Sequence, residues 1–297
     1  MAAPPDSADR HPLWAMQRQL LEGHVWTDLT HAFHPGQPHF PAFPDEERTQ
    51  VFDVAKDGFT VHRHTIVGQW GTHVDPPSHF VEGARTLDDV PIEQMVLPLV
   101  VLDISHRVED DPDAVPTLDD VAAWEQRNGP IPAGSFVALR TDWWRRWPDA
   151  AAMENRDADG VSHAPGWSRE VVEHLVAAGV TAIGHEQTDT DAGRSTSAGD
   201  YGLELLWLQN DRWQIELMAR LDEVPEVGAL ILASWPKPKG GSGSAAWIAT
   251  TRAGNPEPPL GLGHDARISA PTSGTSSRRA MSSICQRSFC SHSSSRP

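Results

Sequence analysis

A nearly continuous apolar run, LPLVVLDIS, lies at residues 97–105 and limits the folds that this chain can adopt. A strand with one face in water alternates apolar and polar side chains, whereas this run is apolar at successive positions and contains β-branched residues. Such a strand must be covered by other structure on both faces of its sheet. We therefore expect residues 97–105 to form a central, fully buried strand.

Strands and helices alternate through the middle of the chain. Residues 117–127 begin with a threonine cap and two acidic residues, and their apolar residues then follow at helical spacing. Residues 135–142 and 180–186 have strand patterns, and residues 168–179 between them predict a helix. Residues 229–236 predict a last strand. This alternation predicts the α/β class.

The first third of the chain is less regular. Residues 13–22 carry apolar side chains at helical spacing, and Gly23 ends this helix before a predicted strand at 25–33. Residues 34–47 are rich in proline, which excludes a helix or a central strand, so we expect a loop. Residues 59–67 predict a strand that leads directly into the segment after it.

Residues 204–221 could form one helix, or a helix followed by a strand. Asn210 and Asp211 are turn-forming residues and favour a break between the two. In one helix, Glu204 and Glu216 would lie about 18 Å apart, at a rise of ~1.5 Å per residue. With a reversal of the chain, the two carboxylates can converge.

Length and charge limit the class of protein. The chain has 297 residues, 39% of them hydrophobic, which suffices for one large domain with a sizeable core. Its 24 Lys and Arg against 41 Asp and Glu give a net charge of −17, which argues against nucleic acid or an anionic membrane as partner. We find neither a signal peptide nor an apolar run of about 18 residues. We expect a cytoplasmic enzyme that acts on a small molecule.

The end of the chain differs in composition from the rest. Residues 253–297 are rich in Ser, Arg, Pro and Gly, and we expect them to be disordered. Cys285 and Cys290 both lie there, so neither a disulfide framework nor a thiolate zinc site is expected in the body. We divide the chain into a helical extension (1–24), a single domain (25–252) and this tail. A frameshifted or truncated tail, with the last strand partly lost, is an alternative.

Residues 69–80 (QWGTHVDPPSHF) place two histidines and an aspartate within a short segment. Imidazole nitrogen and carboxylate oxygen are ligands that divalent cations prefer. His73 and Asp75 lie two residues apart, so in an extended chain they project from the same face. Gly71 allows a tight turn, and two prolines direct the chain so that His79 returns toward the metal. The motif predicts a metal site.

Two further groups of polar side chains have an open role. One follows the strand at 180–186 and has four ionisable members: His185, Glu186, Asp189 and Asp191. Such a group is as typical of a solvated loop as of a pocket. His31, His34 and His39, with phenylalanines nearby, could line the mouth of a substrate pocket.

The motif resembles the signature HxGTHxDxPxHF of the metal-dependent cyclase family, which includes bacterial kynurenine formamidase and isatin hydrolase. The GTH, D, P and HF elements fall at the same offsets, and the resemblance extends over roughly residues 25–244. It implies an α/β domain of the swivelling β/β/α type, with a mixed sheet and flanking helices. It also implies a homodimer or larger assembly.

The resemblance also implies a set of site residues. Five positions of this chain match the metal ligands of the family: Gln69, His73, Asp75, Glu204 and Glu216. His79 matches the catalytic histidine. The family usually has histidine where this chain has Gln69 and Glu204, so the ligand set is richer in oxygen. We therefore expect zinc or manganese, as one or two ions. The sequence does not identify substrate-binding residues.

We expect a metal-dependent hydrolase that cleaves the C–N bond of an amide, formamide or lactam, as in arylformamidases. Metal-activated water would attack the carbonyl carbon, and His79 would act as acid and base. Tryptophans at positions 70, 143 and 144 favour an aromatic substrate. A lactone hydrolase or a cyclase with the same site is one alternative, and a metal-poor, non-catalytic binding protein is another.

Overall fold

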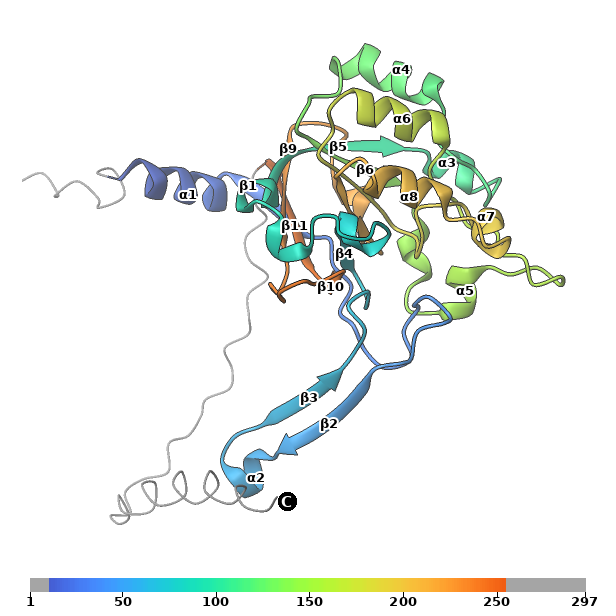
Figure 1. Ribbon diagram of the computed structural model, residues 1–297. Coiled ribbons are helices and arrows are strands. Elements are labelled where there is room, and N and C mark those ends of the chain that lie inside the picture. Colours follow the sequence, from blue (N-terminus) through green and yellow to red (C-terminus); the bar gives the residue numbers. More distant parts are fainter. Residues whose placement is uncertain (1–10, 255–297) are drawn as a thin grey trace, which may run out of the picture. The chain divides into compact units, whose positions relative to one another are not determined.

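The computed structural model describes residues 11–254, and its centre is a nine-stranded mixed sheet (Figure 1). The strand order is β1-β11-β9-β5-β6-β7-β8-β4-β10, and β2 and β3 form a separate two-stranded sheet. The strands are β1 His24–Asp28, β2 Glu47–Phe52, β3 Val61–Thr65, β4 His73–Asp75, β5 Val96–Asp103, β6 Phe136–Arg140, β7 Ala182–His185, β8 Trp213–Glu216, β9 Ala229–Ser234, β10 Ser244–Ala245 and β11 Trp247–Ala253.

Strand β5 lies inside the large sheet, parallel to β6 on one side and antiparallel to β9 on the other. Its side chains alternate between two hydrophobic clusters. Val100 and Leu102 belong to one cluster, and Leu99 and Val101 belong to the other. All four side chains are at most 2% exposed. The predicted central strand with two buried faces is confirmed.

Helices α4, α6 and α8 lie together in Figure 1 and supply one of these clusters. Trp124, Leu175 and Trp207, one from each helix, share a cluster with Val100 of β5. The helices are α1 Pro12–Glu22, α2 Val54–Asp57, α3 Ser105–Val108, α4 Leu118–Asn128, α5 Ala150–Glu154, α6 Arg169–Ala177, α7 Gly193–Ser197 and α8 Gly202–Leu208. Short 3-10 turns are η2 Pro77–His79, η3 Leu87–Asp89, η4 Ile92–Met95, η5 Trp143–Arg146 and η6 Leu221–Glu223. The mixed sheet with flanking helices agrees with the predicted fold class.

Side-chain hydrogen bonds cap the first turns of helices α4 and α6. Thr117 Oγ1 accepts a hydrogen bond from the Asp120 backbone N–H, and the Asp120 carboxylate accepts one from the Thr117 N–H. Ser168 caps α6 by accepting from the Val171 N–H. Each cap satisfies backbone donors that the first turn of a helix leaves free.

Two predicted strands differ from the structure. The strand predicted at 25–33 ends at Asp28, where the pairing of β1 with β11 stops. The strand predicted at 59–67 is present as β3, but it pairs only with β2 and does not join the large sheet. Every residue of β2 and β3 is exposed. The segment before the metal motif is therefore a hairpin and not a core strand.

Strand β11 pairs with β1 on one side and with β9 on the other. The sheet therefore contains a further strand after the one predicted as the last, at 229–236. Ala253, expected to begin a disordered tail, is the final residue of β11. Residues 255–297 of that predicted tail, like residues 1–10, lie outside the described residues, and the domain boundaries stay predictions. No helix within residues 11–254 is long and apolar enough to cross a membrane.

Candidate metal centre

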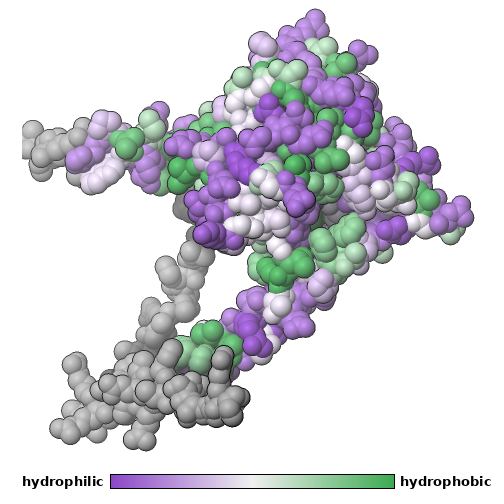
Figure 2. Space-filling model, viewed as in Figure 1, coloured by the Kyte–Doolittle hydropathy of each residue, from purple (hydrophilic) through white to green (hydrophobic). Residues whose placement is uncertain are grey.

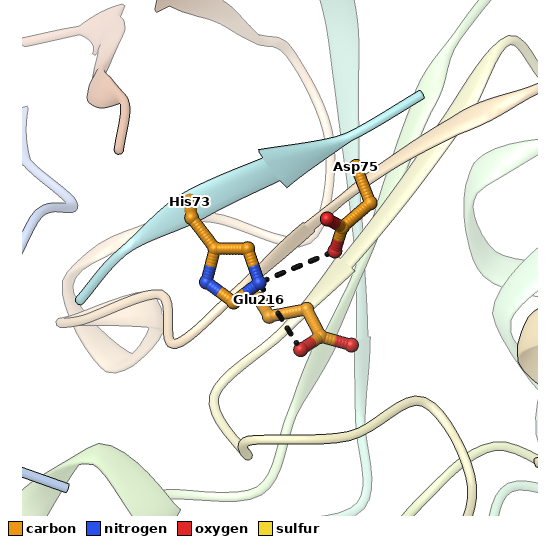
Figure 3. A group of neighbouring side chains, drawn as sticks. All are labelled: His73, Asp75 and Glu216. Carbon is orange, nitrogen blue, oxygen red and sulfur yellow. Dashed lines mark ion pairs between the residues drawn. The ribbon is translucent and has the colours of Figure 1, made fainter. Parts of the chain in front are cut away.

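Strands β4 and β8 pair in antiparallel register, and this register places His73 opposite Glu216. Asp75 follows two residues later in β4, so its side chain projects from the same face. His73 Nε2 lies 3.2 Å from Asp75 Oδ2 and 3.4 Å from Glu216 Oε2 (Figure 3). All three residues are buried. Strand register thus assembles a compact group of possible metal ligands.

The turns beside these strands are tightly defined. Gly71 has a φ of 64°, and a Cβ there would lie 3.1 Å from the Cβ of Phe33, so glycine is required. Leu217, directly after Glu216, also has a positive φ, of 54°. Thr72 Oγ1 donates a 2.6 Å hydrogen bond to the Leu217 carbonyl and so joins the turn before His73 to the turn after Glu216.

His79 returns to the same group through the 3-10 turn η2, as the prolines of the motif predict. His79 Nε2 lies 4.0 Å from Asp75 Oδ1 and 3.8 Å from Glu204 Oε1. Asp75 therefore belongs to two candidate ligand groups, one with His73 and Glu216 and one with His79 and Glu204. The His79 side chain is 23% exposed, far more than that of Asp75.

Glu204 reaches the site because the chain reverses after α8. The helix ends at Leu208, and Asp211 adopts a positive φ in the turn before β8, so the predicted break is confirmed. Asp191 holds the start of α8, since its carboxylate accepts hydrogen bonds from the backbone N–H groups of Leu203 and Glu204. Glu204 and Glu216 thereby converge, which a single helix could not achieve.

Gln69 lies beside the site as a hydrogen-bond donor. Its Nε2 donates to Asp75 Oδ1 at 3.1 Å and to the Ser242 carbonyl at 2.9 Å, and it lies 3.3 Å from His79 Nδ1. A Cβ on Gly243 would lie only 1.9 Å from this nitrogen, which explains the glycine there. A ligand role for Gln69 would require its amide oxygen, rather than its nitrogen, to face the cation.

Desolvation dominates the electrostatics of the carboxyl groups. It raises the pKa of Glu216 well above the usual range, and the charges of Glu204 and Asp75 raise it further. The pKa of Glu204 is also raised well above its usual range, by desolvation first and then by the charge of Asp75. Burial acts against ionised Asp75 as well, but charged His73 beside it lowers the Asp75 pKa overall. An added positive charge would relieve the repulsion among these carboxylates.

Two polar residues that support the site escape the sequence prediction. Gln214 Nε2 donates hydrogen bonds to Glu204 Oε1 at 2.9 Å and to Glu216 Oε1 at 3.1 Å. Thr190 Oγ1 donates to Gln214 Oε1 at 2.8 Å. A polar residue two positions before Glu216 in an apolar strand shares its face, and this spacing was the available signal for Gln214.

The four-residue group after β7 divides among different roles. His185 Nε2 lies 3.4 Å from Glu216 Oε1, and its Nδ1 accepts a hydrogen bond from Trp167 Nε1. Desolvation lowers the His185 pKa to about 3, so this imidazole is neutral. Asp191 supports α8, and Asp189 lines the cavity described next. Glu186 points elsewhere and accepts hydrogen bonds from residues that follow β6.

A cavity of about 190 Å³ opens over the candidate ligands. Its walls are aromatic and include Phe40, Phe43, Phe80 and Tyr201, with His39 from the predicted pocket mouth. His31 and His34 do not line it and pack against Trp147 instead. The tryptophans at 70, 143 and 144, which suggested an aromatic substrate, are likewise outside its described lining.

The side chains that converge here suit a divalent cation. Three carboxylates and two imidazoles face one another, and Asp75 Oδ2 is a buried oxygen without a hydrogen-bond partner among the described residues. This oxygen has the ion-pair contact with His73, and a bound cation would offset more of the cost of burying its charge. Oxygen-rich sets of this kind suit manganese as well as zinc.

Comparison with known proteins places this geometry in context. Residues 27–192 match the model of a family described as putative cyclase. A curated relative, isatin hydrolase of Roseibium aggregatum, is 30% identical over 241 residues, which cover 76% of this chain and 91% of that protein.

Solved structures agree with the sequence comparisons. A crystal structure of an isatin hydrolase bound to the product analogue thioisatinate has a TM-score of 0.76 and 27% identity, over 84% of this chain and 100% of its own. Isatin hydrolase A from Ralstonia solanacearum has a TM-score of 0.73 and 31% identity, over 85% of this chain and 99% of its own. A potential metal-dependent hydrolase with cyclase activity shares the fold at 20% identity and a TM-score of 0.57, over 79% of this chain and 100% of its own.

Proposed function

Because this chain belongs to the cyclase family, we propose that it is a metal-dependent hydrolase that cleaves an amide-type C–N bond in a small molecule. The relatives described as isatin hydrolases support a lactam or a related aryl amide as substrate. The compact cavity with phenylalanine and tyrosine walls supports an aromatic substrate.

One observation carries this proposal. His73, His79 and three carboxylates from three separate elements converge at the floor of one aromatic cavity. Desolvation of so many acidic groups at one place is unfavourable unless a cation or a reaction uses them. A stabilising role alone would not require this arrangement.

The ligands of the cation would be His73, Asp75 and Glu216, with Glu204 and Gln69 as further candidates. Zinc and manganese, as one or two ions, both fit this set, and the share of oxygen favours manganese. When bound, such a cation acidifies a water molecule and polarises a carbonyl group.

His79 is placed to move protons at the exposed edge of this site. Gln69 Nε2 lies 3.3 Å from His79 Nδ1. To act as a base toward the cavity, the neutral imidazole must carry its proton on Nδ1 and leave Nε2 unprotonated. That nitrogen borders the cavity between Asp75 and Glu204, whose negative charges would stabilise the protonated ring. His79 can thus take a proton from water and deliver it to the leaving nitrogen.

A substrate panel tests this proposal. Protein loaded with Mn²⁺ or Zn²⁺ would be incubated with isatin, N-formylaniline and a benzo-fused lactone, and product formation would be followed by absorbance. We expect hydrolysis of at least one of the two C–N substrates. Turnover of the lactone alone would favour the lactone hydrolase. Failure to retain metal together with no turnover would favour the metal-poor binding protein.

We also propose that the protein forms a homodimer or a larger assembly. The β2–β3 hairpin has exposed residues throughout and carries large apolar side chains, including Phe52 and Phe59. Figure 2 shows hydrophobic surface at the tip of this hairpin. Isolated two-stranded hairpins are marginally stable in water, so a second copy packed against this one would stabilise it. The cytoplasmic location expected from the sequence stays a prediction.

A further inference from the structure

Gln214 occupies an unusual position between two acidic side chains. It lies in β8 two residues before Glu216, and its side chain is completely buried. The single amide nitrogen donates to Glu204 at 2.9 Å and to Glu216 at 3.1 Å. Both N–H bonds of the amide are therefore directed at carboxylate oxygens from two different elements.

The orientation of this amide follows from the partners at both of its ends. A buried glutamine can exchange the positions of its oxygen and nitrogen by rotation, and then its oxygen would face the carboxylates. Thr190 Oγ1 donates to Gln214 Oε1 at 2.8 Å, and Thr190 is itself fully buried. A threonine hydroxyl can donate or accept, but ionised carboxylates only accept, so the two N–H groups face Glu204 and Glu216 and the oxygen is left to accept from Thr190.

The two carboxylates need such a donor. Their mutual charge and burial oppose ionisation of both groups, and the residues that line the adjoining cavity include no lysine or arginine. A neutral double donor reduces the repulsion, and it leaves the Glu216 oxygen that faces His73, Oε2, available to a cation.

We propose that Gln214, oriented by Thr190, is a positioning residue that holds Glu204 and Glu216 together as one cation-binding pair. This inference rests on the metal site of the proposed function. It also explains how the site accommodates two buried glutamates close together, because the amide of Gln214 donates to both.

The direct test is metal affinity, measured by calorimetric titration of metal-depleted protein with Mn²⁺. Gln214→Met keeps the size of the side chain and removes both donors. We expect its Mn²⁺ affinity to fall roughly 10- to 100-fold, the range typical for residues that orient metal ligands. Thr190→Val removes the hydroxyl that donates to Gln214 Oε1, together with its 3.5 Å contact with Glu216. This variant should lower the affinity in the same direction and serves if Gln214→Met does not fold.

Gln94→Met is the matched control. Gln94 also has a hydrogen-bonded amide near β8, where its Oε1 accepts from Trp213 Nε1, but it does not contact the carboxylates. Its Mn²⁺ affinity should equal that of the parent. Circular dichroism and thermal unfolding of the metal-free proteins would show whether the compared variants are folded.

A variant with Glu204 replaced distinguishes two roles of Gln214: donating to both carboxylates, or only filling space. With Glu204→His in place, the pair of carboxylates no longer exists, so adding Gln214→Met should cost much less affinity than it costs the parent. Two results would overturn the positioning role of Gln214. One is an equal loss of affinity in both backgrounds, and the other is a Gln214→Met variant whose Mn²⁺ affinity is within twofold of the parent. Failure of the parent to bind Mn²⁺ or Zn²⁺ would overturn it as well. If the parent binds metal but hydrolyses no substrate, the proposed activity is wrong, and these affinities still decide the positioning role of Gln214.

Discussion

At the scale of single residues, His79 differs from the other members of the metal centre. His73, Asp75 and Glu216 are buried and in mutual contact, whereas His79 borders the cavity and lies 3.8 Å or more from its two acidic neighbours. This placement suits a group that exchanges protons with a substrate better than a group that only holds a cation.

His79→Ala should therefore keep the metal and lose turnover. We expect kcat to fall by about 10²- to 10⁴-fold, the usual contribution of a general acid or base. Metal content by elemental analysis and turnover of isatin would be measured on the same sample. His62→Ala, on the exposed hairpin, is the control. Loss of metal from His79→Ala would identify His79 as a ligand instead.

The role of Gln69 can be tested by replacing it with histidine. Imidazole is a stronger donor to zinc than an amide oxygen, so Gln69→His should raise the affinity for Zn²⁺ relative to Mn²⁺. We expect a change of roughly tenfold, equivalent to about 1.4 kcal/mol, in competition titrations. Gln50→His adds a histidine to the exposed hairpin as a control. An unchanged Zn²⁺ to Mn²⁺ ratio would place residue 69 outside the ligand set.

The ligand residues could be proposed from sequence, but their partners could not. His73, Asp75 and His79 occur in one short motif, and their chemistry is visible in that segment alone. Gln214 and Thr190 acquire a role only through the register of β8 against β4 and the reversal after α8. Local spacing could show that Gln214 shares a face with Glu216, but it could not show the strand register or the contacts with Glu204 and Thr190.

At the scale of elements, β6 and β7 are joined beyond their ends by a buried acid. Glu186 Oε2 accepts hydrogen bonds from the Thr141 N–H and hydroxyl and from the Trp143 N–H. Desolvation nevertheless raises the Glu186 pKa to about 8. The folded protein therefore holds a proton on this group up to a higher pH than the unfolded chain does.

This acid predicts a pH-dependent difference in stability. Stability from protonated Glu186 is fully present below the ordinary glutamate pKa and is lost as pH rises through about 8. Glu186→Gln keeps an acceptor oxygen for Thr141 and Trp143 and does not titrate. The melting temperature of the variant relative to the parent should therefore rise between pH 5 and pH 9, by several degrees. A constant difference across that range would contradict a titrating Glu186.

Elements with complete local signals were predictable. The apolar run of β5 and the capped sequence of α4 each predict the type of element and the side chains that it buries. The structure confirms these predictions for both elements. The β2–β3 hairpin was not predictable as a separate sheet, because its strand-forming residues look the same whether they pair with the core or with each other. Tertiary pairing decides between these outcomes.

At the scale of the whole molecule, the exposed hairpin predicts self-association. The rings of Phe52 and Phe59 lie 5.0 Å apart and are 41% and 52% exposed. Replacing both with serine should shift the protein toward monomers in analytical ultracentrifugation, because the contact would lose apolar area. Thr49→Ala on the same hairpin should leave the assembly unchanged. A parent that is monomeric at all concentrations would refute the predicted homo-oligomer.

Measuring hydrolysis as a function of bound metal decides whether this protein is a metal-dependent hydrolase. Metal-depleted protein would be titrated with Mn²⁺, and isatin turnover would be followed together with metal content. We predict that turnover is absent without metal, rises in proportion to occupancy and saturates when the site of His73, Asp75 and Glu216 is filled. Full occupancy with no turnover above that of Mn²⁺ in buffer, or turnover independent of metal, would contradict a metal-dependent hydrolase.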